Sequence, residues 1–207
     1  MRWPFVNNTR MIKTAAKTIL KNVAKQFGYK MINGVPYKIV HDEFYKINVL
    51  TSSMHDEVEY SISLYFKPLC CDDTLWKILG ISDDMAAQPV SIHCNGAFTA
   101  PCVRLFEKTY SIKNKNEIPD FFVQQFETFE HLINESDHCW LSSLYINDTA
   151  TDYGITQNIL YHIAKGNNTQ ALLFIEKELK QGKEGLFVLG DRPFMESAKE
   201  YCLSYDQ

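Results

Sequence analysis

Hydrophobic residues recur at a helical spacing near the start of the chain. Between residues 10 and 27 they stand three and four positions apart, on one face of a helix: Ile12, Ala16, Ile19, Leu20, Val23 and Phe27. Asn8 or Thr9 suits the start of this helix, and Gly28 suits its end. We therefore expect an amphipathic helix whose apolar face packs on a sheet.

A row of lysines follows another face of the same helix. They stand at every fourth position, where like charges repel slightly: Lys13, Lys17, Lys21 and Lys25. The row must face water or an anion. The spacing alone does not decide whether the row is functional.

A strand pattern replaces the helical one after residue 36. Three runs with short connections predict an antiparallel meander: residues 37–41, 44–52 and 59–67. In the third run Ile62, Leu64 and Phe66 alternate with polar residues, which is typical of a half-buried strand. Residues 90–94 and 103–112 look like two further strands.

The later part of the chain is mainly helical. A short helix is expected at 72–80, and a longer one at 118–135 with an aromatic stripe: Phe122, Phe126, Phe129 and Ile133. Residues 140–146 fit a strand or an extended connection. The last sixty residues suggest helices at about 152–165, from 167–169 to 179, and from 191 onward.

These elements indicate the α+β class. We expect an N-terminal amphipathic helix packed on a mostly antiparallel sheet of four to five strands, with a helical C-terminal third. A length of 207 residues fits a single domain, 1–207. Within it, residues 1–115 would hold the helix and the sheet, and 116–207 a mainly helical part packed on it.

The net charge of −4 hides an asymmetry, because residues 1–40 hold eight Lys or Arg and no Asp or Glu. This indicates either a basic face for an anionic partner or a basic helix that packs against the acidic remainder of the same chain. We favour the second interpretation. No nucleic-acid motif accompanies the Lys row, which argues against nucleic acid. No run approaches the roughly 18 apolar residues of a membrane span, and no targeting signal is evident. We expect a soluble cytoplasmic protein without a membrane partner.

Six cysteines raise the question of metal or thiol chemistry. Paired metal ligands two to four residues apart are missing, and adjacent residues such as His93 and Cys94 point to opposite faces of a strand. Reduced core or loop thiols are the favoured interpretation. Cys94 is the best thiol candidate, because a loop edge could expose it. We expect no metal and no cofactor, and we assign no catalytic residue.

One stretch carries a family resemblance: ILKNVAKQFGYKMINGVPYKIVHDEFYKINVLTSSMHDEVEYSISLYFKP, residues 19–68. A basic helix ends in a Gly-aromatic-Lys sequence. It is followed by a strand like FYKINV and then by a strand with alternating apolar residues that ends near Pro. This resembles an uncharacterised bacterial family, domain of unknown function 4304. The resemblance implies an α+β fold and a bacterial cytoplasmic origin, and it brings no catalytic residues.

Two hypotheses about function stay open. The first is a non-enzymatic, immunity-like module that binds another protein through a polar, aromatic face of the sheet with Tyr45 and Tyr65, since aromatic residues are enriched at interfaces. Helices from the second half could instead cover that face. The second is an enzyme with an unfamiliar thiol or carboxylate site; no phosphate-binding loop is present.

Overall fold

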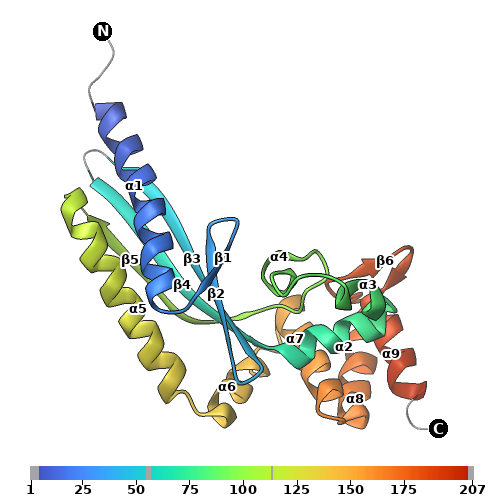
Figure 1. The fold of residues 1–207 in the computed structure, drawn as a ribbon. Coiled ribbons are helices and arrows are strands. Elements are labelled where there is room, and N and C mark those ends of the chain that lie inside the picture. Colours follow the sequence, from blue (N-terminus) through green and yellow to red (C-terminus); the bar gives the residue numbers. More distant parts are fainter. Residues whose placement is uncertain (1–4, 55–56, 113, 205–207) are drawn as a thin grey trace. The chain divides into compact units, whose positions relative to one another are not determined.

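The computed structural model describes residues 5–54, 57–112 and 114–204 (Figure 1). Contacts within the chain define two compact units. The first comprises residues 1–40, 45–66 and 104–136, and the second comprises 41–44, 67–103 and 137–207. The chain thus leaves the first unit twice before residue 136, briefly at residues 41–44 and again at residues 67–103.

The first unit holds most of a sheet and two long helices. Its elements, in chain order, are α1 (Phe5–Gln26), β1 (Lys30–Ile32), β2 (Val35–Val40), β3 (Glu43–Met54), β4 (Glu57–Pro68), β5 (Val103–Ile112), η1 (Lys115–Glu117) and α5 (Ile118–Glu135). The five strands form an antiparallel sheet in the order β1-β2-β3-β4-β5.

Two-residue turns fix the start of the sheet. Asn33 and Gly34 join β1 to β2 with positive φ angles of 49° and 83°, and Ile32 pairs with Val35 across the turn. His41 and Asp42 join β2 to β3 with φ angles of 51° and 64°. Positive φ at both central residues matches the right-handed twist of the flanking strands.

Both helices of the first unit pack on one face of the sheet. Phe122 of α5 lies against Tyr60 of β4 with ring centroids 5.9 Å apart. Phe27, just after α1, lies 5.5 Å from Phe126 of α5 between ring centroids. Figure 1 shows α1 and α5 running along the sheet. The core of this unit is therefore aromatic, and it lies between the sheet and the two helices.

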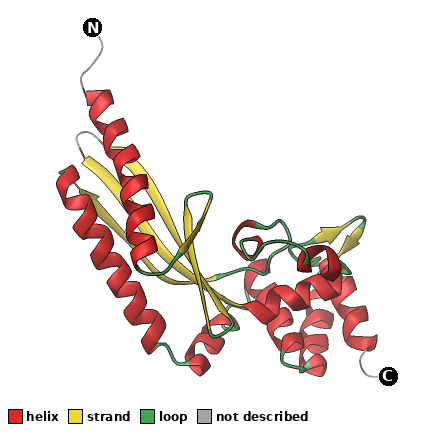
Figure 2. Ribbon diagram, viewed as in Figure 1, coloured by secondary structure: helices red, strands yellow, loops and turns green. Residues whose placement is uncertain are grey.

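The second unit is built mainly from helices, as Figure 2 shows by colour. Its elements are α2 (Leu69–Leu79), α3 (Ser82–Ala86), α4 (Ile92–Asn95), α6 (His138–Tyr145), α7 (Asp152–Ala164), α8 (Asn168–Leu179), β6 (Val188–Leu189), β7 (Arg192–Pro193) and α9 (Phe194–Ser204). Helices α2, α7, α8 and α9 pack on one another. The strands β6 and β7 form a small antiparallel hairpin.

The α+β class, the N-terminal helix, the antiparallel sheet and the helical C-terminal part are confirmed. The aromatic stripe of α5 is buried, as its spacing predicts. In α1, Leu20 and Val23 are buried, while Lys17, Lys21 and Lys25 are exposed. Ile19 and Phe27 are half-buried, and the side chain of Ile12 lies outside the described residues.

Three local predictions are wrong. Helix α1 begins at Phe5, so Asn8 and Thr9 lie inside it instead of capping it. Residues 90–94 form a turn and α4, because local bonds such as Ile92 N to the Pro89 carbonyl (2.8 Å) occupy the groups a strand would share. Residues 140–146 belong mostly to α6, whose N-cap Asp137 accepts a bond from Cys139 N (3.1 Å).

The division of the chain also differs from the expected boundary at 115–116. Helix α5 belongs to the same unit as the sheet, and α2 to α4 belong to the other unit with the C-terminal helices. The reason is the insertion of residues 67–103 between two strands that are neighbours in the sheet.

Candidate functional site

A cleft of about 630 Å³ opens in the first unit. Helix α1 contributes Ala16 and Leu20 to its lining, and further lining residues come from β3 and from the turn between β1 and β2. Tyr60 and Phe122 contribute to the lining from β4 and α5. A volume of this size lies within the range of small-molecule sites in proteins, roughly 300–1,000 Å³.

Tyr60 is the polar residue most deeply placed in this lining. Its side chain is fully buried, and its ring contacts the rings of Phe121 (5.7 Å) and Phe122 (5.9 Å), measured between centroids. Within the described residues, its hydroxyl group has no hydrogen-bond partner. Burial raises the pKa of Tyr60, so the hydroxyl stays protonated and is a donor. A buried donor without an acceptor costs about 1–3 kcal/mol.

Two lysines of α1 give the cleft its charge. Lys13 and Lys17 stand one helical turn apart and both line the cleft. Lys17 is exposed and Lys13 is half-buried. The described residues of the lining include these two cations and no Asp or Glu.

The other face of the sheet is polar and has cross-strand hydrogen bonds. Thr109 of β5 donates to Ser61 of β4 (3.2 Å), and Ser63 donates to Glu107 of β5 (3.4 Å). On β4 and β3, the ammonium group of Lys46 lies 6.0 Å from the centroid of the Tyr65 ring. Glu107 and Thr109 are exposed and Tyr65 is half-buried. This face, called the polar sheet face below, comprises Lys46, Ser61, Ser63, Tyr65, Glu107 and Thr109.

The structure separates the two tyrosines expected to share a surface. Tyr65 lies on the polar sheet face, but Tyr45 is only 1% exposed and packs on Phe66 with ring centroids 5.6 Å apart. Side chains alternate between faces along a strand. In this antiparallel pair Tyr45 is near Phe66 and Lys46 is near Tyr65, so the two tyrosines point to opposite faces. Tyr45 therefore belongs to the core, which corrects its assignment to a partner-binding surface.

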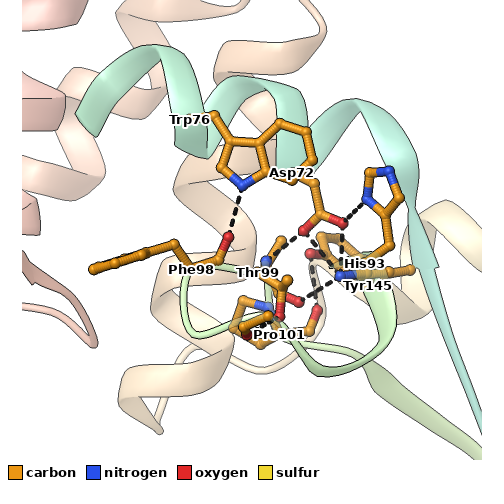
Figure 3. A network of polar contacts seen from close by, with 10 residues as sticks. Asp72, Trp76, His93, Phe98, Thr99, Pro101 and Tyr145 are labelled. Atoms are coloured by element: carbon orange, nitrogen blue, oxygen red, sulfur yellow. Dashed lines mark hydrogen bonds and ion pairs between the residues drawn. The ribbon is translucent and has the colours of Figure 1, made fainter. Parts of the chain in front are cut away.

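A buried polar network organises the second unit (Figure 3). The carboxylate of Asp72, in the first turn of α2, accepts bonds from Lys67 Nζ (2.9 Å) and from the Ala100 backbone N–H (2.5 Å) through Oδ1. Its Oδ2 lies 2.6 Å from Nδ1 of His93. A carboxylate can only accept, so His93 donates from Nδ1 to Asp72.

Aromatic contacts support the same network. The rings of His93 and Trp76 stack with centroids 5.1 Å apart. Trp76 Nε1 donates to the Phe98 carbonyl (2.6 Å), and the Tyr145 hydroxyl donates to the Pro101 carbonyl (3.0 Å). Figure 3 shows these bonds converging on the loop between α4 and β5. A paired His and Asp can move a proton, but here the arrangement also fixes the loop.

The first turn of α2 also carries two unlike thiols. Hydrogen bonding from Cys71 and the charge of Lys165 lower the pKa of Cys70 to about 7, against burial and Asp73. Burial raises the pKa of Cys71 well above its ordinary value. Cys70 is half-buried, whereas Cys94 is only 3% exposed. The interpretation of Cys94 as an exposed loop thiol is therefore wrong, and Cys70 is the better candidate.

Sequence reasoning missed the cleft, Cys70 and the network around Asp72. The signal that favours a thiolate at Cys70 is its position in the first turn of a helix. Within the described ranges, no group of three or more His, Cys, Asp or Glu side chains is arranged to hold a metal ion.

Comparisons with protein-family models, curated proteins and solved structures found no match to this chain. In the part of the chain that the structure describes, each helix is too short or too polar to cross a membrane.

Proposed function

We propose that this chain is a non-enzymatic module that binds another protein through the polar sheet face. The observation that carries the proposal is the position of Tyr65: a partly exposed aromatic ring among charged and hydroxyl side chains. Helix α5 packs on the opposite face through Phe122 and Tyr60, and Phe27 at the end of α1 packs on Phe126 of α5. Aromatic anchors surrounded by polar groups are typical of protein interfaces.

Hydrogen bonds between neighbouring strands hold side chains of the polar sheet face in place before any partner binds. Thr109 is bonded to Ser61, and Glu107 is bonded to the buried Ser63. A partner would meet side chains whose rotamers are largely fixed, so little conformational entropy is lost on binding. Tyr65 would supply apolar area at the centre, with Lys46 and Glu107 as charged groups around it.

The test compares two tyrosines. Partners are captured from the native host with the wild-type chain, purified, and titrated calorimetrically against wild type, Tyr65→Ala and Tyr153→Ala. Tyr153 is a matched control, because it is 64% exposed on α7 of the second unit. We expect Tyr65→Ala to weaken Kd by roughly thirty-fold, as for an interface hot spot of about 2 kcal/mol. Tyr153→Ala should leave Kd nearly unchanged, and equal Kd values for both variants would refute the proposal.

We also propose a bacterial cytoplasmic setting, membership of the family named domain of unknown function 4304, and an immunity-like role. The described cysteines are all thiols, which suits a reducing compartment. The experiment above tests the role, because an immunity-like module should capture one cognate partner in stoichiometric amount.

A second candidate function is an enzyme that uses a thiol, and one observation favours it. The Cys70 thiol, with its pKa lowered to about 7, is substantially ionised near neutral pH. A thiolate is the nucleophilic form of cysteine. Selective modification of Cys70 by a substrate-like electrophile, at a rate far above that of a free thiol, would favour this function over the binding module.

A further inference from the structure

We propose that the cleft of the first unit binds a small amphipathic carboxylate, that is, a molecule with an apolar body and one anionic end. The cleft lies on the helix-covered face of the sheet, as its lining by α1, β4 and α5 indicates. It is therefore distinct from the polar sheet face. The inference does not depend on the proposed protein-binding function.

The walls define the apolar part of the ligand. Apolar side chains of the lining come from several elements: Ala16 and Leu20 of α1, Val35 of β2, Val49 of β3 and Phe122 of α5. Apolar surface of this kind gains free energy when it is removed from water, at about 25 cal/mol per Å². A cleft of about 630 Å³ has room for an alkyl chain or a ring system rather than for a single ion.

The charge of the cleft defines the anionic end. Lys13 and Lys17 both contribute to the lining, and Lys17 is exposed. Asn33, in the turn between β1 and β2, adds an amide group that can donate hydrogen bonds. The described lining residues also include no Arg, and they form no helix N-terminus, the two features that most often hold phosphate. A singly charged carboxylate therefore fits better than a phosphate ester.

The buried hydroxyl of Tyr60 is the second observation that points to a ligand. It lacks a hydrogen-bond partner among the described residues, and it belongs to a residue of the lining. The neighbouring rings of Phe121 and Phe122 hold the Tyr60 ring in place. An acceptor atom on a ligand that reached this depth would satisfy the hydroxyl and would gain more than a contact at the surface.

The experiment titrates the full-length chain with decanoate and with indole-3-acetate, two carboxylates with different apolar bodies. Decyltrimethylammonium is the control ligand of opposite charge and similar length. Binding is measured by calorimetry, and the site is located by backbone amide shifts in NMR spectra. We expect saturable binding of at least one carboxylate, with shifted amides in β3, in the β1–β2 turn and around Lys13 and Lys17. The cation should not bind saturably.

Matched lysine variants test the charge. Lys13→Gln/Lys17→Gln removes both charges from the cleft, whereas Lys21→Gln/Lys25→Gln removes two exposed charges of the same row outside the lining. The first pair should weaken Kd about tenfold, which corresponds to 1.4 kcal/mol, and the second pair should not. Thr51→Trp, which places a large ring in the lining from β3, should abolish binding.

Two outcomes would overturn the inference. One is the absence of saturable binding of either carboxylate to the wild-type chain. The other is an equal effect of both lysine pairs, because the anion would then be attracted by the helix as a whole and not by the cleft. Circular dichroism and thermal unfolding of each variant verify that a loss of binding is not a loss of fold.

Discussion

Lys67 Nζ lies 2.7 Å from Oδ2 of Asp72, and both side chains are fully buried. Lys67 stands near the end of β4 and Asp72 near the start of α2, so the pair joins a strand to the helix that follows it. The Lys67 ammonium also lies 5.4 Å from the centroid of the Phe44 ring. A buried charge with its partner removed is one of the costliest defects in a protein interior.

The variant Lys67→Met should therefore destabilise the chain strongly. It leaves the Asp72 carboxylate buried without its cation, and we expect a loss of about 3–5 kcal/mol. Urea unfolding measures the change. Lys38→Met is the control, because Lys38 pairs with Glu130 at 2.7 Å where both side chains are partly exposed, and it should cost about 1 kcal/mol. A loss for Lys67→Met no larger than for Lys38→Met would contradict the prediction.

Removing the hydroxyl of Tyr60 should not destabilise the protein. Because that hydroxyl is buried without an acceptor in the described residues, Tyr60→Phe should leave the free energy of unfolding unchanged or raise it by about 1 kcal/mol. In Tyr110→Phe, the hydroxyl lost is one that donates to Gln125 at 2.8 Å. That variant should lower stability by about 1 kcal/mol. The reverse order in thermal unfolding would show that Tyr60 has a partner in solution.

The Cys70 thiol should react with iodoacetamide as a thiolate with a midpoint near pH 7. Its ordinary pKa is 9.0, so the reaction rate should level off about two pH units earlier than for an unperturbed thiol. Cys71→Ala should move the midpoint upward most, because the hydrogen bond from Cys71 is the largest cause of the shift, and Lys165→Gln should move it less. Mass spectrometry of peptides identifies the modified residue. A midpoint near pH 9 in the wild type would rule out an activated Cys70.

Helix α1 should be an integral part of the first unit. Leu20 is buried in it, so Leu20→Ala should cost about 2–5 kcal/mol. Lys21→Gln and Lys25→Gln change exposed residues, and each should stay within roughly 0.5 kcal/mol of the wild type. If Leu20→Ala hardly changed the melting temperature, the helix would be a detachable arm.

Periodic elements of this fold are visible in the sequence, because their burial follows a regular spacing. The stripe of α5 is the best example: Phe122, Phe126, Phe129 and Ile133 are all buried. The alternation of Ile62, Leu64 and Phe66 likewise predicts the buried face of β4. Strand β1 was missed, although the Asn33-Gly34 pair is a recognised hairpin signal.

The candidate sites could not be predicted in the same way. Lys67, Asp72 and His93 follow no common period, and a buried ion pair has the same residue types as an exposed one. Their meeting depends on α4 bringing His93 back to α2, in a segment whose short apolar run is equally compatible with a strand. The cleft depends on how α1 crosses the sheet, which is a property of packing and not of any single segment. Tyr45 was misplaced although alternation within β3 puts it on the same face as Ile47, which is buried as well.

The insertion of residues 67–103 between parts of the first unit has a consequence for synthesis on the ribosome. Strand β4 is complete at Pro68, but its neighbour β5 begins only at Val103. During translation at about 5–20 residues per second, β4 has an unpaired edge for several seconds. Unpaired edges of nascent sheets are sites of aggregation. The nascent chain is therefore most vulnerable in this interval, and a translational pause between Leu69 and Cys102 should increase its dependence on chaperones.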